Sequence, residues 1–184
     1  LTTIKNYNNT SLNKFGSSFR HSQLVGLIDD TNDPIRSNIT KIKLKKRIKP
    51  TLGKIQGWKD SDAIKYGGSI VKGSVTSDKF TVCNLLENGT SYDGQLTFTD
   101  DSAGNINLID AGDKVKKFSD IGTVDYAKGI IKLDGVAFKT IVSGSDYVHI
   151  TVDVDDAIDI KPLAKEVILI QDADITVTMV EDVT

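Results

Sequence analysis

The sequence has few of the residues from which cross-links and metal sites are built. Its 184 residues include one cysteine, two histidines, one tryptophan and three prolines. A single cysteine excludes an internal disulfide, and one cysteine with two histidines cannot supply a four-ligand zinc site. A chain of this length buries roughly 70% of its unfolded surface, so its core needs no such cross-link. We expect Cys83 to be a small buried hydrophobe on a strand rather than a reactive thiol.

Long apolar runs are also missing. No uninterrupted stretch approaches the ~18–20 residues that span a bilayer, and no basic-then-apolar signal peptide opens the chain. We therefore predict no membrane association. The chain begins at Leu1 and its only methionine is Met179, so we expect a processed protein or a fragment of a longer one. We predict a connector, helix and basic strand over residues 1–60 and a β-rich domain over residues 61–184.

Groups that perform acyl transfer are scarce. This chemistry needs a nucleophile with a base in reach, and only His21 and His149 could serve as a histidine base. The fold could still bring Cys83 close to a histidine that is distant in the sequence. It could likewise bring together two carboxylates of the kind that hydrolyse glycosides. The glycine-rich stretch 67–74 has Ser74 where a phosphate loop needs its lysine. We predict that the protein is not an enzyme and binds no cofactor.

Clustered carboxylates over residues 153–159 suggest a calcium loop, because Ca²⁺ prefers oxygen ligands. Counted from Asp153, however, Ile158 stands in place of the glycine at the sharp turn, and Ala164 in place of the final glutamate. We favour solvated carboxylates at a strand end over a nonstandard calcium site, and we predict no metal.

The net charge is only −2, but it is distributed unevenly. Residues 1–60 hold twelve Lys/Arg against four Asp/Glu, a net of +8, while residues 61–184 hold eleven against twenty-one, a net of −10. The densest basic run, Lys41 to Lys49, has no interleaved aromatic residues for base stacking. We predict that it docks on acidic protein and not on nucleic acid. The asymmetry is compatible with complementary docking between copies or onto charged neighbours, and equally with two solvated faces that cancel.

The N-terminal third predicts one helix and one strand. Residues 1–17, rich in Asn, Thr, Ser and Lys, are typical of an extended connector. Ser18 to Asp30 predicts a helix that Ser18 caps, because its apolar residues fall near one face, and Asp33-Pro34 marks a boundary. Ser37 to Ile48 predicts a half-buried strand, because apolar residues alternate there with lysines.

The remainder predicts short strands separated by turns. Ile121 to Leu133 reads as a strand-turn-strand in which Gly129 takes a positive φ. The other predicted strands share a spacing of about ten residues. They are 69–75, 79–86, 95–99, 105–109, 115–118, 137–142, 147–153, 166–171 and 175–180. Trp58 is expected to pack against the sheet. The fold class is therefore mainly β (α+β), with antiparallel sheets in a sandwich or partly open barrel and a short N-terminal helix-plus-strand unit.

Three stretches resemble one protein family. The first is Leu24–Asp30 followed by Asp33–Thr40 and the lysine-rich strand, the second is Ile121–Ile131, and the third runs from Asp159 to Thr178. Together they resemble the C-terminal part of a baseplate wedge protein. This is the inner-ring "hinge-pin" subunit of T-even-like contractile-tailed bacteriophages, which is related to baseplate J-like proteins.

The resemblance implies a non-enzymatic structural protein of the virion tail baseplate, made in the host cytoplasm. It implies homodimers, an inner ring, contacts with other wedge proteins and a rearrangement when the sheath contracts. The candidate interface combines an apolar helix face with basic strand residues. These are Leu24, Leu27, Ile28, Lys43, Lys45, Lys46 and Arg47. The alternative is a β-rich tail or surface module that binds glycan or receptor, although a single tryptophan argues against a sugar-stacking surface.

Overall fold

The structure, a computed structural model, describes residues 1–31, 38–84, 86–87, 89–154, 159–162 and 166–177. It contains two compact units. The first draws on both ends of the chain, Leu1–Thr40 and Asp156–Thr184, and the second is Lys41–Asp155. The division into domains at residue 60 stays a prediction.

The first unit is built on two helical segments. Helix α1 (Thr2–Tyr7) continues into a short π-helix, η1 (Asn8–Leu12), and helix α2 (His21–Asp29) follows. The prediction of an extended connector was therefore wrong for most of residues 1–17. Tyr7 and Leu12 are buried, and the Tyr7 ring packs edge-on against Phe19 with centroids 6.2 Å apart. This apolar burial outweighs the weak helix propensity of the surrounding Asn and Thr residues.

The predicted helix at Ser18–Asp30 is confirmed, but its N-terminal cap is not. Helix α2 begins at His21, and Arg20 stands at the cap position in an extended conformation without a side-chain capping bond. Phe19 forms an isolated antiparallel bridge with Ile160, in which each N–H donates to the other carbonyl at 2.9 Å. That bridge holds the preceding backbone extended. The predicted boundary at Asp33-Pro34 lies outside the described residues.

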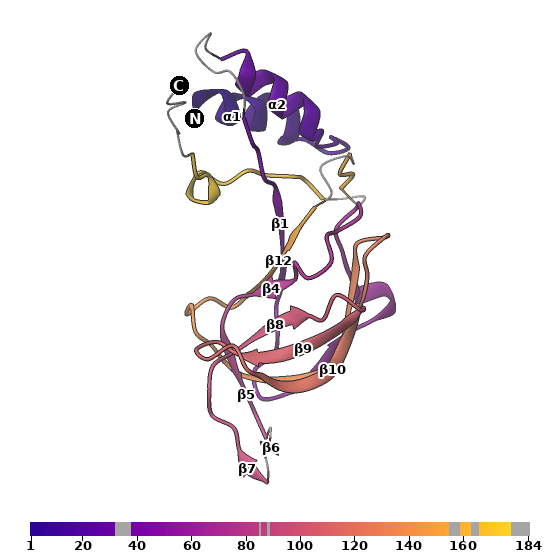
Figure 1. Cartoon of the computed structure of the whole chain (residues 1–184), viewed down its shortest axis with the longest axis vertical. Helices are drawn as coiled ribbons and strands as arrows, with labels where there is room; N and C mark the ends of the chain where they lie inside the picture. The colour runs from indigo at the N-terminus through magenta and orange to yellow at the C-terminus, as the bar shows by residue number, and fades with distance from the viewer. Residues whose placement is uncertain (32–37, 85, 88, 155–158, 163–165, 178–184) are drawn as a thin grey trace, which may run out of the picture. The chain divides into compact units, whose positions relative to one another are not determined.

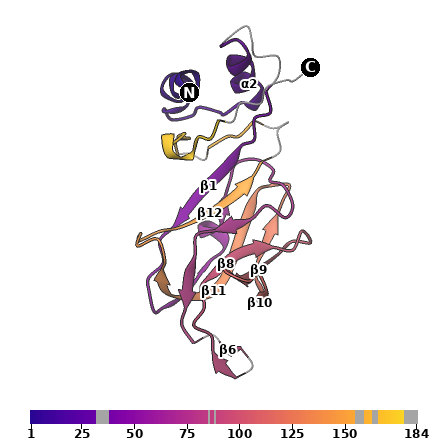
Figure 2. The ribbon, with the colours of Figure 1, turned by 60° about the vertical axis from the view of Figure 1, so that its left-hand side comes forward.

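The second unit is an antiparallel sheet that closes partly into a barrel (Figures 1 and 2). Its strands are β1 (Lys43–Ile48), β2 (Ile55–Trp58), β3 (Ile64–Lys65), β4 (Thr76–Ser77), β5 (Phe80–Val82), β6 (Leu86–Glu87), β7 (Thr90–Ser91), β8 (Leu96–Asp100), β9 (Asn105–Asp110), β10 (Lys116–Asp125), β11 (Ile130–Ile141) and β12 (Val148–Asp153). The main strand order is β1-β12-β4-β8-β5-β11-β10-β9, and a further β8–β9 pairing closes the barrel. Strands β2 and β3 pair with β11, while β6 and β7 form a separate hairpin that extends away from the barrel.

The fold class predicted from the sequence is confirmed, and so is the turn that precedes β11. Gly129 has a φ of +59°, and a Cβ there would lie 2.0 Å from the carbonyl oxygen of Gly68. Glycine is therefore required for conformation and for space. Strands β10 and β11 each merge two strands that were predicted separately, because the chain passes through bulges without turning.

Two strand predictions were wrong because side chains take up the backbone groups that a ladder would use. Within residues 69–75, the N–H groups of Gly73 and Val75 donate hydrogen bonds to the Asp100 carboxylate at 2.6 and 2.9 Å. In residues 166–171, the Asn8 side chain bonds both backbone groups of Ile170. Of the predicted strand 175–180, residues 175–177 are not in a strand and the rest lie outside the described residues.

The barrel core is aromatic at its centre. Phe80 and Phe138 are fully buried with ring centroids 4.8 Å apart, and Trp58 packs edge-on against Phe138 at 6.0 Å. The expectation that Trp58 packs against the sheet is confirmed. Cys83 was expected to be buried on a strand, but it is half-buried and follows β5. Its thiol lies 3.9 Å from the Phe138 carbonyl oxygen.

Candidate functional site

The basic part of the candidate interface lies on β1, which pairs along its full length with β12. The register places Lys43 opposite Asp153, Lys45 opposite Thr151 and Arg47 opposite His149. Lys43, Lys45 and Arg47 are exposed, whereas Lys46 is half-buried on the other face. The half-buried strand predicted at Ser37–Ile48 is confirmed for Lys43–Ile48, whereas residues 38–42 are not in a strand. The four basic residues are divided between the two faces of β1.

Several charges on and beside β1 have partners nearby. The Lys43 ammonium is 3.1 Å from a carboxylate oxygen of Asp153, and Lys45 and Lys46 also interact within the chain. The Arg47 guanidinium lies 4.5 Å from the centroid of the Tyr147 ring. Exposed ion pairs of this kind contribute about 0–1 kcal/mol. The basic run therefore lies beside Asp153 at the end of β12 and Tyr147 just before β12, so part of its charge has partners within the same unit.

The helical part of the candidate interface belongs to α2. Leu24 is 2% exposed and packs inside the first unit, Ile28 is half-buried, and Leu27 is 39% exposed. Of these three residues, Leu27 and Ile28 present apolar surface to solvent. Because α2 is in the first unit and β1 in the second, the candidate interface is divided between the two units. Its role stays a prediction.

The groups with possible catalytic or metal-binding chemistry have structural partners. His149 Nδ1 is 2.7 Å from Oδ2 of Asp78, and the same oxygen accepts the His149 backbone N–H at 3.0 Å. Within the described residues, no three His, Cys, Asp or Glu side chains are placed to hold a metal ion. Asp153 lies beside Lys43, and Asp159 lies 3.3 Å from Arg20. The other acidic residues of the considered calcium loop, 155 and 156, lie outside the described part.

Carboxylates with lowered pKa values lie in turns, where backbone amides bond to them. The Asn105 backbone N–H, followed by the Asn105 side chain and the Ala103 N–H, lowers the pKa of Asp101 to about 2. The Tyr92 hydroxyl is the main cause of the lowered pKa of Asp110. These groups hold loops in place, and their pKa values have a structural explanation.

Asp100 is the residue that sequence reasoning missed. It is buried at the end of β8 and accepts hydrogen bonds from the N–H groups of Gly73 and Val75 and from the Tyr126 hydroxyl. Desolvation, and next the bond to Asp100, raises the pKa of Tyr126. The sequence shows a turn at Ala103-Gly104, but it carries no signal for bonds to a segment more than twenty residues away.

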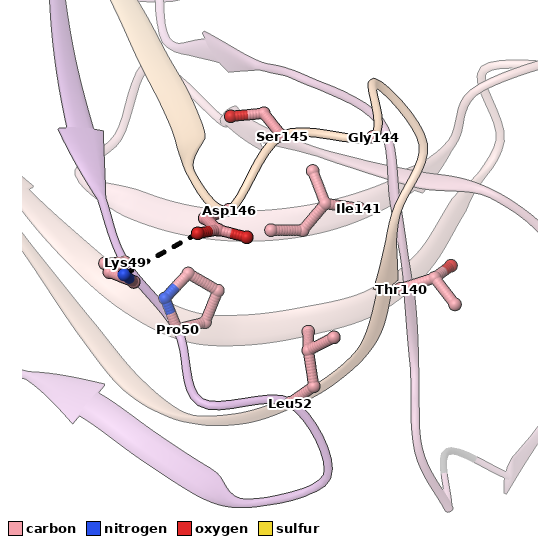
Figure 3. Close-up of a pocket in the computed structure, with 8 residues that line it drawn as sticks. All are labelled: Lys49, Pro50, Leu52, Thr140, Ile141, Gly144, Ser145 and Asp146. Carbon is pink, nitrogen blue, oxygen red and sulfur yellow. Dashed lines mark ion pairs between the residues drawn. The ribbon is translucent and has the colours of Figure 1, made fainter.

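The hollow drawn in Figure 3 lies beside the residues that follow β1. It has a volume of about 360 Å³ and is lined by Lys49, Pro50, Leu52, Thr140, Ile141, Gly144, Ser145 and Asp146. Lys49 and Asp146 form an ion pair at 3.6 Å, and the Leu52 side chain is 52% exposed. A paired charge beside an open apolar side chain suits a contact surface, and it offers no activated nucleophile.

A second hollow, of about 490 Å³, lies over β4, β8 and their neighbours. Its lining includes the hydroxyl-bearing side chains of Thr76, Thr97 and Thr99, with Lys79 and Lys114 also in the lining. Its surface is polar and open. None of the helices in the described part of the chain has the length and apolar character to cross a membrane.

Comparison with known proteins concerns the N-terminal part. Residues 1–47 match the family described as baseplate structural protein gp6, C-terminal domain III. This match supports a phage baseplate structural protein. It also supports a location in the virion tail. The matched segment contains α1, α2 and most of β1, and all seven residues of the candidate interface lie within it. No curated protein matches the chain.

Proposed function

We propose that the chain is a structural subunit of a phage baseplate wedge, which forms homodimers and an inner ring and binds other wedge proteins. The observation that carries this proposal is the match over residues 1–47, which contains every residue of the candidate interface. In this proposal the protein performs no catalysis, is made in the host cytoplasm and acts through its surfaces.

A dimer contact on α2 is the simplest route to such an assembly. A symmetric dimer buries the same patch from both copies, so one exposed apolar residue contributes twice. Leu27 is 39% exposed on a helix whose neighbouring residue Leu24 is buried, so Leu27 can be changed without opening the unit's interior. In a ring, each copy needs a second and different contact elsewhere on its surface.

Rearrangement on sheath contraction is the third element of the proposal. The chain passes from the first unit to the second after Thr40 and returns after Asp155. If each unit keeps its internal contacts, the units can move as rigid bodies and contact different partners without unfolding. This property suits a subunit that holds one form of a baseplate and then adopts another.

The test is the mass of the 184-residue chain in solution, measured by light scattering over a range of concentration and salt. We expect a dimer that Leu27→Asp converts to a monomer. The matched control is Val115→Asp, at an exposed apolar residue of the second unit that lines neither hollow, which should leave the dimer intact. A monomer at every concentration, with the chain folded, would contradict the dimer.

The glycan- or receptor-binding alternative stays a prediction. Trp58 is half-buried against Phe138, and the Arg47 guanidinium lies over the Tyr147 ring, so both rings already have packing partners within the chain. A glycan array probed with the folded protein distinguishes the two functions, because a wedge subunit should give no signal there.

A further inference from the structure

Strand β1 lies at an end of the sheet. It pairs with β12 on one side, and no strand of the described residues pairs with it on the other. Figure 2 shows β1 running beside β12. An edge strand of six residues presents a row of backbone donors and acceptors that a further strand can use.

The hydrogen-bond pattern of β12 shows which groups of β1 face outward. Asp153 directs its N–H to Ser74 and accepts the Val71 N–H at its carbonyl, both on the side away from β1. His149 likewise accepts the Asp78 N–H on that side. These two residues therefore belong to pairs that exchange no ladder bonds with β1.

It follows that their partners on β1 point away from β12 as well. Lys43 is opposite Asp153 and Arg47 is opposite His149, so both direct their N–H and C=O toward the edge. Within the described part of the chain, no hydrogen bond occupies these four groups. Lys45 lies midway between Lys43 and Arg47, so its backbone groups point in the same direction as theirs.

The side chains of this edge carry a uniform sign. Lys43, Lys45 and Arg47 all lie on the exposed face, whereas Leu44 and Lys46 are half-buried on the other. If a copy of β1 paired antiparallel about Lys45, Lys43 of one copy would meet Arg47 of the other. Like charges directly opposite are destabilising, so the edge rejects a second β1.

The described part of the chain offers no acidic strand of its own for this edge. Carboxylates two residues apart occur at Asp60 and Asp62 and at Asp172 and Asp174, and both pairs lie in 3₁₀ turns. Asp153 lies in β12, which is already paired on both sides by β1 and β4. Charge complementarity together with this arrangement of the described carboxylates favours a segment of a different protein as the partner.

We propose that β1 accepts an extended acidic segment of another protein as an added strand. Carboxylates at alternate positions of that segment lie opposite Lys43, Lys45 and Arg47, and the apolar residues between them cover the face of Leu44. Backbone bonds to Lys43 and Arg47 provide the attachment, and charge sets the choice of partner. The proposal does not depend on the homodimer, because the homodimer contact is proposed on α2 of the first unit and not on this edge.

The first test uses the 184-residue protein and three synthetic peptides. The first peptide alternates glutamate and valine, the second has lysine in place of glutamate, and the third has the first peptide's composition with its glutamates grouped together. Binding is measured by titration calorimetry at low and high salt. We expect binding of the alternating acidic peptide only, with an affinity that falls as salt rises.

Amide exchange followed by NMR locates the bound peptide. The N–H groups of Lys43 and Arg47 should exchange rapidly in the free protein and become protected when the acidic peptide binds. Those of Leu44, Lys46 and Ile48 face β12 and should be protected in both states. This alternation is specific to an added strand, and a contact made by side chains alone does not produce it.

Variants separate the backbone from the charge. Arg47→Pro removes an outward N–H that β12 does not use, and it should weaken binding about fivefold to tenfold relative to Arg47→Ala, which keeps that N–H. Arg47→Glu should also weaken binding. Lys54→Glu, at an exposed loop lysine of the same unit, is the matched control and should change little. Circular dichroism checks that every variant is folded.

Three results would overturn the proposal. One is no binding of the acidic peptide at millimolar concentration, which would mean that the lysines only protect the edge. Another is equal binding of the lysine peptide. The third is binding that leaves the Lys43 and Arg47 amides unprotected, which would locate the peptide elsewhere, for example at the hollow over β4 and β8. If the chain is monomeric and still binds the acidic peptide, that result contradicts the proposed homodimer and supports the added strand at β1.

Discussion

The hydroxyl of Tyr126 donates a hydrogen bond of 2.6 Å to the carboxylate of Asp100. This contact joins the end of β8 to the turn between β10 and β11. The same carboxylate holds the N–H groups of Gly73 and Val75, so one buried side chain fixes three segments of the second unit.

Asp100→Asn should destabilise the protein by about 2–3 kcal/mol, because an amide cannot accept at both ends and leaves buried N–H groups unpaired. Urea unfolding measures this loss. Tyr126→Phe, which removes only one bond to the same carboxylate, should cost about 1 kcal/mol. Equal losses in the two variants would show that the bonds to Gly73 and Val75 contribute nothing.

Gly129→Ala should cost more than an ordinary glycine replacement. The new Cβ would lie 2.0 Å from the Gly68 carbonyl oxygen, so the backbone must shift in addition to adopting a positive φ. We expect a loss of about 2–4 kcal/mol, in the range of overpacking added to backbone strain. The control is Gly144→Ala, where φ is +71° and nothing lies within 4 Å of the added Cβ. Only the conformational part, about 1 kcal/mol, should appear there.

Asp101 should make stability depend on pH under acidic conditions. Its pKa in the folded protein is lowered to about 2 by the Asn105 and Ala103 bonds, from an ordinary value of 3.8. The unfolded chain therefore binds this proton first. The contribution of Asp101 is present above pH 3.8 and is lost as pH falls through about 2. Unfolding measured over this window should show a slope that Asp101→Asn reduces, and NMR titration should give the low pKa directly. A titration midpoint near 3.8 would contradict the turn bonds.

Leu24 and Leu27 should separate stability from assembly. Leu24→Ala removes a fully buried side chain, so we expect a loss of about 2–5 kcal/mol in unfolding free energy. Leu27→Ala, at a position 39% exposed on the same helix, should change stability by less than about 1 kcal/mol but lower the mass in solution. If Leu27→Ala leaves the mass of a dimeric protein unchanged, α2 is not the contact.

Local patterns predicted much of the fold, and the errors have common physical causes. Residues 95–99, 105–109 and 147–153 were correctly predicted as strands to within one residue at each end. Buried and half-buried residues alternate in β12, so one of its faces is buried, whereas β8 and β9 each have three consecutive buried residues. Helix α1 was missed, since a segment rich in Asn and Thr forms a helix here only through tertiary burial of Tyr7 and Leu12.

The candidate site was predictable in part. Alternation correctly placed β1 as a half-buried strand, whereas the position of β1 at an edge and its neighbour Asp153 depend on a pairing about one hundred residues apart. Asp100 could not be found, because its role comes from backbone groups of Gly73 and Val75 that have no signature in the sequence.

The first unit is assembled from both ends of the chain. Phe19 pairs with Ile160, Lys5 with Asp172 and Asn8 with Ile170. During synthesis, residues 1–31 leave the ribosome before their partners, and they cannot complete these contacts until Ile160, Ile170 and Asp172 have emerged. The second unit, Lys41–Asp155, is synthesised entirely before these residues, so it can fold before the first unit is complete. The segment that resembles a baseplate domain is thus made before the residues that complete its unit, so a nascent chain cannot present the finished surface of the first unit to a partner until Asp172 has emerged.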